Sequence, residues 1–438
     1  MSKIRLHGSS SGYTEIAPVA ASGNNTITLP NDGTIISKDA NGAVGVTSIK
    51  SSNVNVGTAV TITESGIEAS GIGITCANIN GTQIGGRRNI IVNGAMNVAQ
   101  RGSSSTSTGY QTIDRFGVTA SGADEAPTQA QVDVASGTTP YTLGFRKAFK
   151  LTNGNQTGGA GATDRMNIYY NVEAQDIANS GWNYTSTSSF VTLSFWVKSS
   201  VAQNFYGRVY TPDGTNMAYI FETGSLSADT WTKVTKTIPG NSNLTFNDDT
   251  GSGWYMEIAQ FIGTDYTDSG VALNNWAAWN NSQRYPDYTS TWYSTNDATF
   301  EYTGVQLEVG SQATAFEHRS KGEEISLCQR YYYLLASGNT QFMCMGDFWL
   351  AGQTDGGITL PVEMRATPSL DHTNGADYYK IWTNGTSSYI DGSISLWNRS
   401  HKRAVTWYAT PDTNRTAGHS ARWITNNSSA HFGFSAEL

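Results

Sequence analysis

Residues 190–200 read FVTLSFWVKSS, and residues 298–310 read ATFEYTGVQLEVG. Within the run Ser194-Phe195-Trp196-Val197-Lys198, a period of two places Phe195 and Val197 on one face and the polar Ser194 and Lys198 on the other. Alternation with a period of two is the pattern of a strand that buries one face. Both stretches therefore predict long strands of a sheet with one face turned to a core.

Strand candidates of the same kind recur on either side of residues 190–200, separated by Gly or Asn turns. A further strand is predicted at residues 90–92, closed by the turn pair Asn93-Gly94. So many antiparallel strands without intervening helices predict a two-sheet β-sandwich of jelly-roll type over residues 87–318. The remaining candidates are DRFGVTA (114–120), LGFRKAFKLT (143–152), MNIYYNVEA (166–174), NFYGRVYT (204–211), MAYIFET (217–223), WTKVTKTI (231–238) and GWYMEIAQFIG (253–263).

The composition points to an all-β protein. Charged residues make up only 14% of the 438, whereas there are 46 Gly, 12 Trp, 22 Tyr and 15 Phe. Aromatic residues suit a pleated surface, Gly supplies corners, and so many rings exclude a chain that buries nothing. A net charge of −8 disfavours nucleic acid as a partner. No apolar run approaches the roughly 20 residues of a membrane span, and no secretion signal opens the chain, so assembly in a host cytoplasm is expected.

Residues 1–86 differ from the rest because they contain no Trp and only short apolar pulses such as TITLP and NVGTAVTITESGIEASGIGITC. Each pulse fits a short strand, but so little apolar bulk cannot offset the backbone entropy of folding in one chain, roughly 1–2 kcal/mol per residue. Several copies wound together could share one narrow core. The segment therefore predicts a fibrous β stalk or docking arm. The protein is expected to be a homo-oligomer, specifically a trimer. A flexible Gly/Ser-rich leader is the alternative.

One helix is predicted, in HRSKGEEISLCQRYYYLL. Ser320 can cap its start, with Glu323 three residues later, and the helix is expected to end near residues 337–338. It forms a helical connector over residues 319–337. Beyond it, residues 338–438 predict a distal β-domain, sandwich-like, with strands in QFMCMGDFWLAG, GGITLPVEM, YYKIWTNG, SSYIDGSISLWN, RAVTWYAT and AHFGFSAEL.

The polar residues show no catalytic or metal-binding pattern. The six His form no HExxH motif, and the three Cys (Cys76, Cys328, Cys344) lack CxxC spacing, so reduced thiols are expected. A glycosidase needs two carboxylates roughly 5–10 Å apart. Asp248-Asp249 would point to opposite faces of a strand, and Glu323-Glu324 suits the first turn of a helix. The sequence therefore predicts no enzyme, no cofactor and no metal.

The segment LNNWAAWNNSQRYPDYTSTWYS, residues 273–294, holds many rings among Asn, Ser and Asp. Rings stack on the apolar faces of sugars, and amides or carboxylates bind hydroxyl groups, so the segment is a candidate carbohydrate site. Packing at the end of the sandwich or in a subunit interface is the favoured alternative. The candidate residues are Trp276, Trp279, Tyr285, Tyr288, Trp292 and Tyr293, with Trp182 and Tyr184 as a second, weaker pair.

Three stretches resemble tail fibres and other virion structural proteins of bacteriophages, particularly phages of marine and cyanobacterial hosts. They are LHGSSSGYTEIAPVAASGNNTITLPNDGTII, RNIIVNGAMNVAQRGSS with TIDRFGV and LSFWVKSS, and FEYTGVQLEVGSQATAFEHRSKGEEISLCQRYYY. The resemblance covers most of residues 1–335 and implies a carbohydrate-binding-module-like jelly roll. Sugar-binding jelly rolls often hold a structural calcium, but Gly304 stands in TGVQLE where a carboxylate is common.

The resemblance implies a virion-attached adhesin, a phage tail fibre, that recognises a host-surface glycan. The arm would dock on tail or baseplate proteins, and the distal domain would touch the host. Ring- and Arg-rich strands there, with Trp382, Trp397, Trp407 and Trp423, would suit receptor contact or cover strand edges. The alternative to a tail fibre is a capsid-bound head fibre or decoration protein. A less favoured alternative is an enzyme, a polysaccharide depolymerase.

Overall fold

The computed structural model describes residues 87–438 in full, together with the backbone of six short strands within residues 1–86. The chain divides into two compact units, Met1–Thr75 and Cys76–Leu438. The predicted fibrous stalk and Cys76 lie outside the described residues, apart from three antiparallel hairpins. These pair Ile4–His7 (β1) with Tyr13–Ile16 (β2), Val60–Thr63 (β3) with Gly66–Ala69 (β4), and Asn78–Ile79 (β5) with Thr82–Gln83 (β6).

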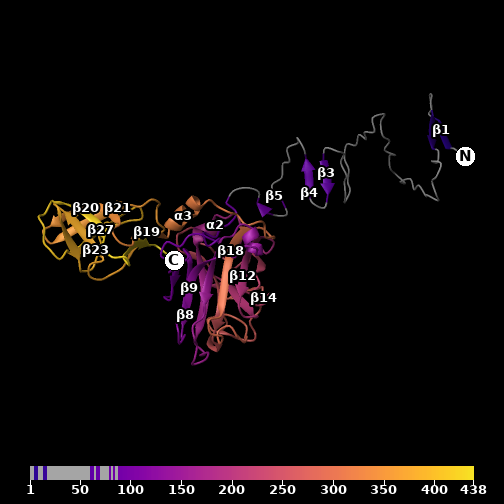
Figure 1. Ribbon diagram of the computed structural model, residues 1–438. Helices are drawn as coiled ribbons and strands as arrows, with labels where there is room; N and C mark the ends of the chain where they lie inside the picture. Colours follow the sequence, from indigo (N-terminus) through magenta and orange to yellow (C-terminus); the bar gives the residue numbers. More distant parts are fainter. Residues whose placement is uncertain are drawn as a thin grey trace. The chain divides into compact units, whose positions relative to one another are not determined.

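Two antiparallel six-stranded sheets form the predicted sandwich (Figure 1). The first sheet has the order β15-β12-β18-β10-β9-β7, and the second has the order β17-β14-β13-β16-β11-β8. The first contains Ser104–Ser105 (β7), Thr128–Asp133 (β9), Lys147–Thr152 (β10), Phe190–Ser199 (β12), Thr232–Pro239 (β15) and Thr299–Val309 (β18). The second contains Phe116–Ser121 (β8), Arg165–Glu173 (β11), Asn204–Thr211 (β13), Met217–Ser225 (β14), Ser252–Ile262 (β16) and Trp276–Ala278 (β17).

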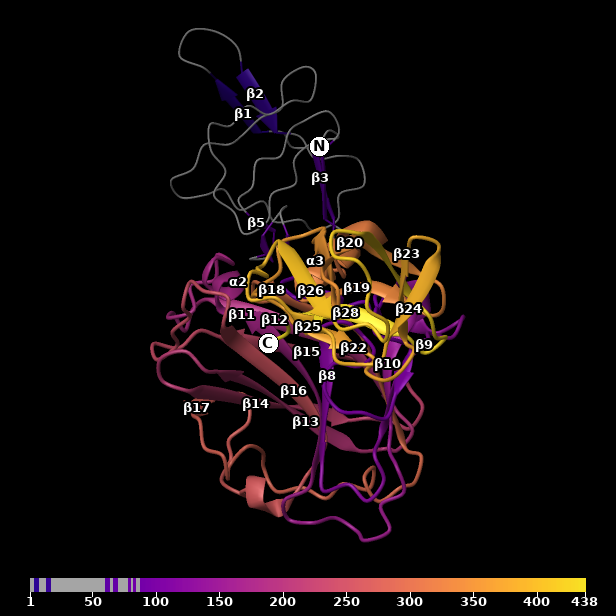
Figure 2. The same ribbon diagram turned by 90° about the vertical axis from the view of Figure 1, so that its left-hand side faces the viewer.

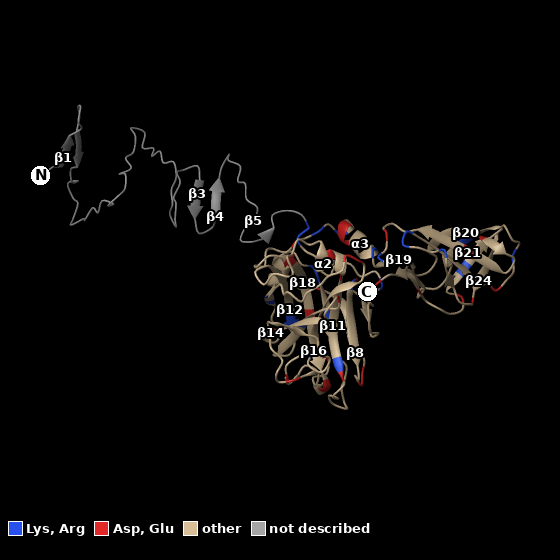
Figure 3. Ribbon diagram, turned by 180° about the vertical axis from the view of Figure 1, so that it is seen from behind, with Lys and Arg blue, Asp and Glu red and all other residues tan. Residues whose placement is uncertain are grey.

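The core of the sandwich is built by the alternation seen in the sequence. In β12, Phe195 and Val197 are fully buried and pack with Tyr302 and Phe300 of β18 and with β16 of the opposite sheet. Charged side chains are sparse over both sheets (Figure 3). Burying this much apolar surface, at about 25 cal/mol per Å², stabilises the sheets against each other. The all-β sandwich expected from the sequence is therefore present.

One predicted strand of the sandwich is absent, because residues 90–92 form no strand although all three side chains are buried. Only one backbone bond links them to a strand, from the Ile90 N–H to the Leu307 carbonyl, at 2.9 Å. The side chain of Asn89 replaces backbone hydrogen bonds that a strand ladder would make. Its Oδ1 accepts hydrogen bonds from the N–H groups of Ile91 (3.0 Å) and Leu307 (3.1 Å).

The helices are short, and no helix in the part of the chain that the structure describes is long and apolar enough to cross a membrane. They are Thr139–Thr142 (α1), Ala174–Ala178 (α2), Lys321–Gln329 (α3) and a 3-10 turn at Thr264–Tyr266. As predicted, Ser320 caps α3 by accepting from the Glu323 N–H at 3.2 Å. The prediction that this helix runs to about residue 337 is wrong. It ends at Gln329, and Tyr332–Ser337 is strand β19, because these β-prone residues pair with β28.

A three-stranded and a seven-stranded sheet enclose a second core beyond α3, with Trp407, Trp423, Phe432 and Phe434 inside it. The smaller sheet, β19-β28-β22, contains β19, Ser369–His372 (β22) and His431–Ser435 (β28). The larger, β24-β23-β27-β20-β21-β26-β25, is shown in Figure 2. Its strands are Phe342–Leu350 (β20), Gln353–Thr359 (β21), Tyr379–Thr383 (β23), Thr386–Ile390 (β24), Ser395–Leu396 (β25), Ala404–Ala409 (β26) and Ser420–Thr425 (β27).

Buried charges join the distal domain to the sandwich. The Arg330 guanidinium donates two hydrogen bonds to the fully buried Glu173 carboxylate, from Nε (2.6 Å) and from Nη2 (2.7 Å). Glu437 forms ion pairs with Arg101 (3.3 Å) and with the buried Arg115. Forked guanidinium–carboxylate pairs are directional as well as strong. The joint is therefore held by specific geometry rather than by apolar contact alone.

Candidate functional site

The outer face of the second sheet carries a row of polar and aromatic side chains. Along β13, Phe205 and Val209 point into the core, so Arg208 and Tyr210 point outward. On β16, Tyr255 and Glu257 alternate in the same way with Trp254 and Met256, which are buried. An outer face that carries tyrosines and arginines across adjacent strands is suited to a ligand.

Strand register brings these outward residues together. Arg208 lies opposite Glu257, and Tyr210 lies opposite Tyr255, in the β13–β16 ladder. On the other side of β16, Asn167 of β11 reaches Glu257 through its side chain. Cross-strand neighbours have Cβ atoms about 4.5–5.5 Å apart, so their side chains form one continuous surface.

The chain after β16 folds back over part of this face and forms one wall of a cleft. Trp279 and Arg284 stand on this returning segment, while Tyr285 packs beneath it with Ala218, Ile220 and Ala259. The wall and the sheet enclose a cavity of about 300 Å³, at the small end of the roughly 300–1,000 Å³ typical of ligand clefts. This outer-face cleft is lined by Thr119, Arg165, Asn167, Arg208, Tyr210, Tyr255, Glu257, Trp279 and Arg284.

Glu257 organises the floor of the outer-face cleft. Its Oε2 accepts from Asn167 Nδ2 (2.9 Å) and from the Tyr255 hydroxyl (2.7 Å). Its Oε1 accepts from the Tyr285 hydroxyl (2.8 Å) and pairs with Arg208 Nη2 (2.8 Å). Burial and the charge of Glu257 hold the pKa of Tyr285 well above its usual value, so the hydroxyl keeps its proton and donates. A carboxylate with four donors has no lone pair left for a ligand.

The arginines of the cleft differ in their hydrogen bonds. Arg284 donates from Nε to the Asn281 backbone carbonyl (3.2 Å) and from Nη2 to the Asn281 side chain, whereas Arg165 and Arg208 keep donors without a partner among the described residues. Arg208 is only 5% exposed, and its Nε and Nη1 form no hydrogen bond with the described residues. The Nε of Arg165 is likewise buried and has no partner in the part of the chain that the structure describes. A buried donor without an acceptor costs about 1–3 kcal/mol. Burial lowers the pKa of Arg284, and the charges of Arg208 and Arg165 act in the same direction, so the three guanidinium groups repel one another.

Aromatic rings flank the arginines. The Tyr210 and Trp279 rings lie 4.9 Å apart, and the Arg208 guanidinium lies 4.2 Å from the Trp279 ring centroid. Tyr255 stacks on Tyr169 at 5.8 Å. Gly117 of β8 makes room for Tyr169, because a Cβ at Gly117 would come within 2.4 Å of that ring. The cleft thus offers ring faces beside N–H donors, the combination that binds sugar rings and their oxygen substituents.

Of the eight residues singled out from the sequence, four lie in the main core. Trp276, Trp292, Tyr293 and Trp182 are at most 6% exposed. Tyr293 stacks on Phe261 at 4.0 Å, and the Trp276 indole donates to the Pro239 carbonyl at 2.7 Å. Side chains so buried offer no ring face to a ligand.

Of the other four, only Trp279 lines the outer-face cleft. Tyr285 is buried behind it and acts through Glu257. Tyr288 packs on Tyr206 at 5.1 Å, and Tyr184 packs on Phe246 at 4.9 Å. The structure therefore does not gather the eight residues into one site.

The sequence analysis did not identify the strand residues of the cleft. Their signal was the alternation within NFYGRVYT and GWYMEIAQFIG, which places Arg208 with Tyr210, and Tyr255 with Glu257, on the face opposite the apolar residues. What the alternation does not reveal is that β11, β16 and β13 are neighbours.

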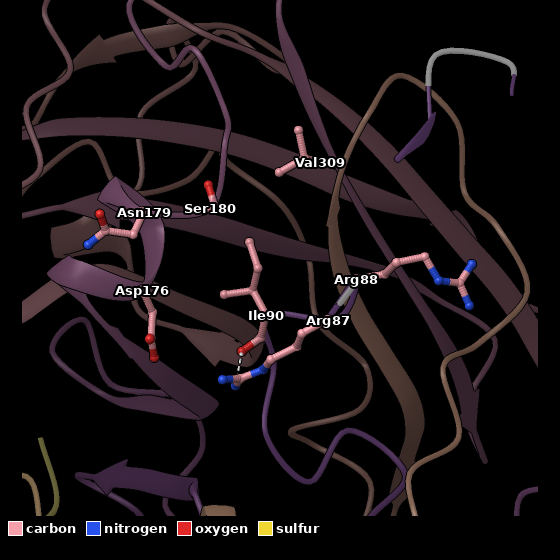
Figure 4. Close-up of a pocket in the computed structure, with 7 residues that line it drawn as sticks. All are labelled: Arg87, Arg88, Ile90, Asp176, Asn179, Ser180 and Val309. Atoms are coloured by element: carbon pink, nitrogen blue, oxygen red, sulfur yellow. Dashed lines mark hydrogen bonds between the residues drawn. The ribbon is translucent and has the colours of Figure 1, made fainter. Parts of the chain in front are cut away.

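A second cavity, of about 240 Å³, lies beside α2 (Figure 4). Asp176, Asn179 and Arg87 surround it, and Arg87 Nη2 donates weakly to the Ile90 carbonyl at 3.5 Å. Burial raises the pKa of Asp176, and the charge of Arg87 opposes the rise. Because its lining residue Arg87 is the first residue after the undescribed residues 84–86, we assign the cavity no ligand.

A third cavity, of about 190 Å³, lies on the outer face of the first sheet between Trp196, Phe145 and Phe316. Gly304 of β18 has a φ of +64°, and a Cβ there would come within 2.7 Å of Phe145. Glycine is therefore required at this position, both by these rings and by the positive φ. No group of three or more His, Cys, Asp or Glu is placed to hold a metal ion among the residues described.

In the distal domain, Trp407 and Trp423 are fully buried, whereas Trp382 is 45% exposed. Large exposed apolar side chains gather on β20 and β23, and contiguous exposed apolar surface often marks an interaction site. They are Phe342, Met345, Trp349, Leu350 and Trp382.

Neither family models nor characterised proteins match the sequence. Among solved structures, the chain is similar to the enzymatically active domain of tailspike protein 4 of bacteriophage CBA120 (TM-score 0.27, 10% identity), where the match covers 50% of this chain and 21% of that one. It is also similar to a putative sugar-binding protein from Bacteroides thetaiotaomicron (TM-score 0.25, 11% identity, 50% of this chain and 99% of that one). A third is the family 11 carbohydrate-binding module from Clostridium thermocellum (TM-score 0.22, 10% identity, 49% and 98%). Likenesses this distant assign no ligand or activity to the present chain.

Proposed function

We propose that this chain is a bacteriophage tail fibre, a virion-attached adhesin that binds a host-surface glycan in the outer-face cleft of its sandwich. The observation that carries the proposal is the cleft itself, in which Tyr210, Tyr255 and Trp279 flank guanidinium groups with free donors. The long stretches that resemble phage fibres support the virion assignment. The net charge of −8 supports a sugar rather than a nucleic acid as ligand.

The binding step is tested with the full chain on an array of bacterial surface glycans, comparing the wild type with Trp279→Ala. Loss of a ring that stacks on the sugar should weaken binding about tenfold, which corresponds to about 1.4 kcal/mol. Trp349→Ala is the matched control, because Trp349 is 64% exposed in the distal domain. If Trp349→Ala abolished binding and Trp279→Ala did not, the glycan site would belong to the distal domain instead.

The virion assignment also needs a location and an oligomeric state. Antibody labelling of intact particles should stain the tail, and staining of the head would support a capsid-bound fibre or decoration protein instead. We propose a homotrimer, in which three weak sites raise the effective concentration of ligand. Sedimentation of the full chain as a stable monomer would contradict the trimer.

We further propose that the chain binds without cleaving. Glu257 is the sole carboxylate among the described residues that line the outer-face cleft, and four donors hold it. Most enzymes that hydrolyse a glycosidic bond use a pair of carboxyl groups at a suitable distance. A depolymerase would lower the viscosity of a host polysaccharide, so a fall in viscosity with the purified chain would overturn this part of the proposal.

A further inference from the structure

We infer that the glycan bound in the outer-face cleft is acidic, and that an oxyanion on the sugar, a carboxylate or a sulfate ester, binds the guanidinium groups of Arg165, Arg208 and Arg284. This inference rests on the proposed glycan-binding function and specifies the class of glycan.

The charges of the outer-face cleft do not balance. Three arginines and one glutamate line it. Glu257 pairs with Arg208, whereas neither Arg165 nor Arg284 has a carboxylate within ion-pair distance in the part of the chain described. Two positive charges therefore remain in a partly buried site, where an opposite charge interacts more strongly than in water.

The unpaired donors show where an anion would bind. Arg208 is more than nine-tenths buried, and its Nε and Nη1 have no acceptor among the described residues. Its position is fixed by the Nη2 bond to Glu257 (2.8 Å) and by the Trp279 ring (4.2 Å from its centroid). A guanidinium group held in one orientation presents a planar fork of N–H groups, which matches the paired oxygens of a carboxylate or sulfate.

The rings select a sugar acid over a free anion. Tyr210, Tyr255 and Trp279 line the same cavity and remain partly exposed, so their faces are open to the apolar side of a pyranose ring. A small inorganic anion would accept hydrogen bonds from the guanidinium donors but would leave the faces of the aromatic rings exposed to water. The cationic cleft also stands out in a chain whose net charge is −8, so general attraction of acidic polymers is not expected.

The test uses isothermal titration calorimetry on the full chain with two matched pairs of polymers. Polygalacturonate is compared with its carboxyl-reduced form, and dextran sulfate is compared with dextran. We expect the acidic member of one pair to bind at least tenfold more tightly than its neutral counterpart, and the pair that responds distinguishes a carboxylate from a sulfate ester. Inorganic sulfate alone should bind far more weakly than the polymer.

The matched variants are Arg165→Gln and Arg284→Gln, each of which should reduce the preference for the acidic polymer over its neutral counterpart by about tenfold. Arg208→Gln is avoided, because it would leave Glu257 buried without its cationic partner. Arg146→Gln is the control, since exposed Arg146 stacks on Tyr141 away from the cleft. Melting temperatures of all variants establish that each is folded.

The outcomes separate the inference from the proposed function. Equal affinity for acidic and neutral members would overturn the acidic-glycan inference and leave glycan binding intact. Tighter binding of the acidic polymer that persists in Arg165→Gln and Arg284→Gln would place the anion elsewhere and also overturn it. Binding of inorganic sulfate as tight as that of the polymer would contradict a saccharide ligand. No binding of any glycan, acidic or neutral, would overturn the proposed function together with the inference.

Discussion

Trp279 and Trp292 belong to one irregular segment, yet their side chains meet different surroundings. Trp292 is fully buried in the main core, whereas Trp279 is half-buried and lines the outer-face cleft. Polar residues adjoin both tryptophans, since Asn280 follows Trp279 and Thr291 precedes Trp292. Burial, not residue type, therefore separates a ring that stabilises the sandwich from one available to a ligand.

This difference predicts opposite effects of the same substitution. Trp292→Ala should lower the free energy of unfolding by about 3–5 kcal/mol, because it opens a large cavity in a packed core. Trp279→Ala should cost much less stability, and its main effect should be on glycan binding. Urea denaturation of both variants measures the difference, and equal losses of stability would contradict the assignment of Trp292 to the core.

Asp114 makes stability depend on pH. Burial raises the pKa of its carboxyl to about 6, although hydrogen bonds from Gln100 oppose the rise. An unfolded Asp titrates near 3.9, so between about pH 4 and pH 6 the folded state keeps a proton that the unfolded state has lost. The free energy of unfolding should therefore fall through this group as pH rises across that window, by about 1.4 kcal/mol per unit at most, and the loss persists above it.

The check is urea denaturation of the wild type and Asp114→Asn at pH 4, 5, 6 and 7. Asparagine cannot ionise, so the variant should gain stability relative to the wild type as pH rises from 4 to 6. Asp297→Asn, at an exposed position, is the control and should show no such trend. A difference between wild type and Asp114→Asn that stays constant with pH would refute the raised pKa.

Among the secondary-structure elements, the sequence located most of the strands with a strong pattern, although it missed β27 (SARWIT), and it missed strands that are polar. Strands β12, β16 and β18 alternate clearly, whereas β9 (TQAQVD) and β22 (SLDH) carry too few apolar residues to stand out. Pairing with neighbouring strands makes these polar stretches extended. Tertiary contact overrode local preference in the same way after α3, where the tyrosines leave the helix and pair with β28.

The start of α3 was predictable because its cap is local. Ser320 accepts the Glu323 N–H, one of the donors that the first turn of a helix leaves without an intrahelical partner. Ser320→Ala should therefore lower the free energy of unfolding by about 1 kcal/mol, and Ser320→Gly by only a few tenths. Denaturant midpoints measure both, and Ser320→Asp should retain most of the wild-type stability.

For the sandwich and the distal domain together, coupling depends on charges buried where the two meet. Glu437 joins Arg101 and Arg115, and the Arg365 guanidinium donates to the carbonyls of Ala436 and Glu437 and to that of Thr250. The Arg115 guanidinium also lies 3.4 Å from the Tyr331 ring centroid. These contacts link residues of both domains in one network.

Removing the charge of Glu437 should loosen this joint. Glu437→Gln leaves Arg115 buried without a counter-ion, and breaking a buried pair costs about 3–5 kcal/mol. We expect calorimetry of the variant to show two unfolding transitions at separate temperatures. In the wild type, the two domains should unfold at temperatures that lie closer together. Glu363→Gln, which breaks an exposed pair with Arg403, is the control. Coupling unchanged in Glu437→Gln would show that the ion pairs of Glu437 do not hold the domains together.

The sequence by itself determined the all-β class, the strongly alternating strands and the cap of α3, because each follows from residues that are neighbours along the chain. Only the tertiary structure decided which rings are buried and which outward-facing side chains meet. Asn167, Arg208, Glu257 and Tyr285 come from separate segments, and the register of three strands brings them together. The neighbours β11, β16 and β13 are far apart in the sequence, so the outer-face cleft exists only once the sheet has formed.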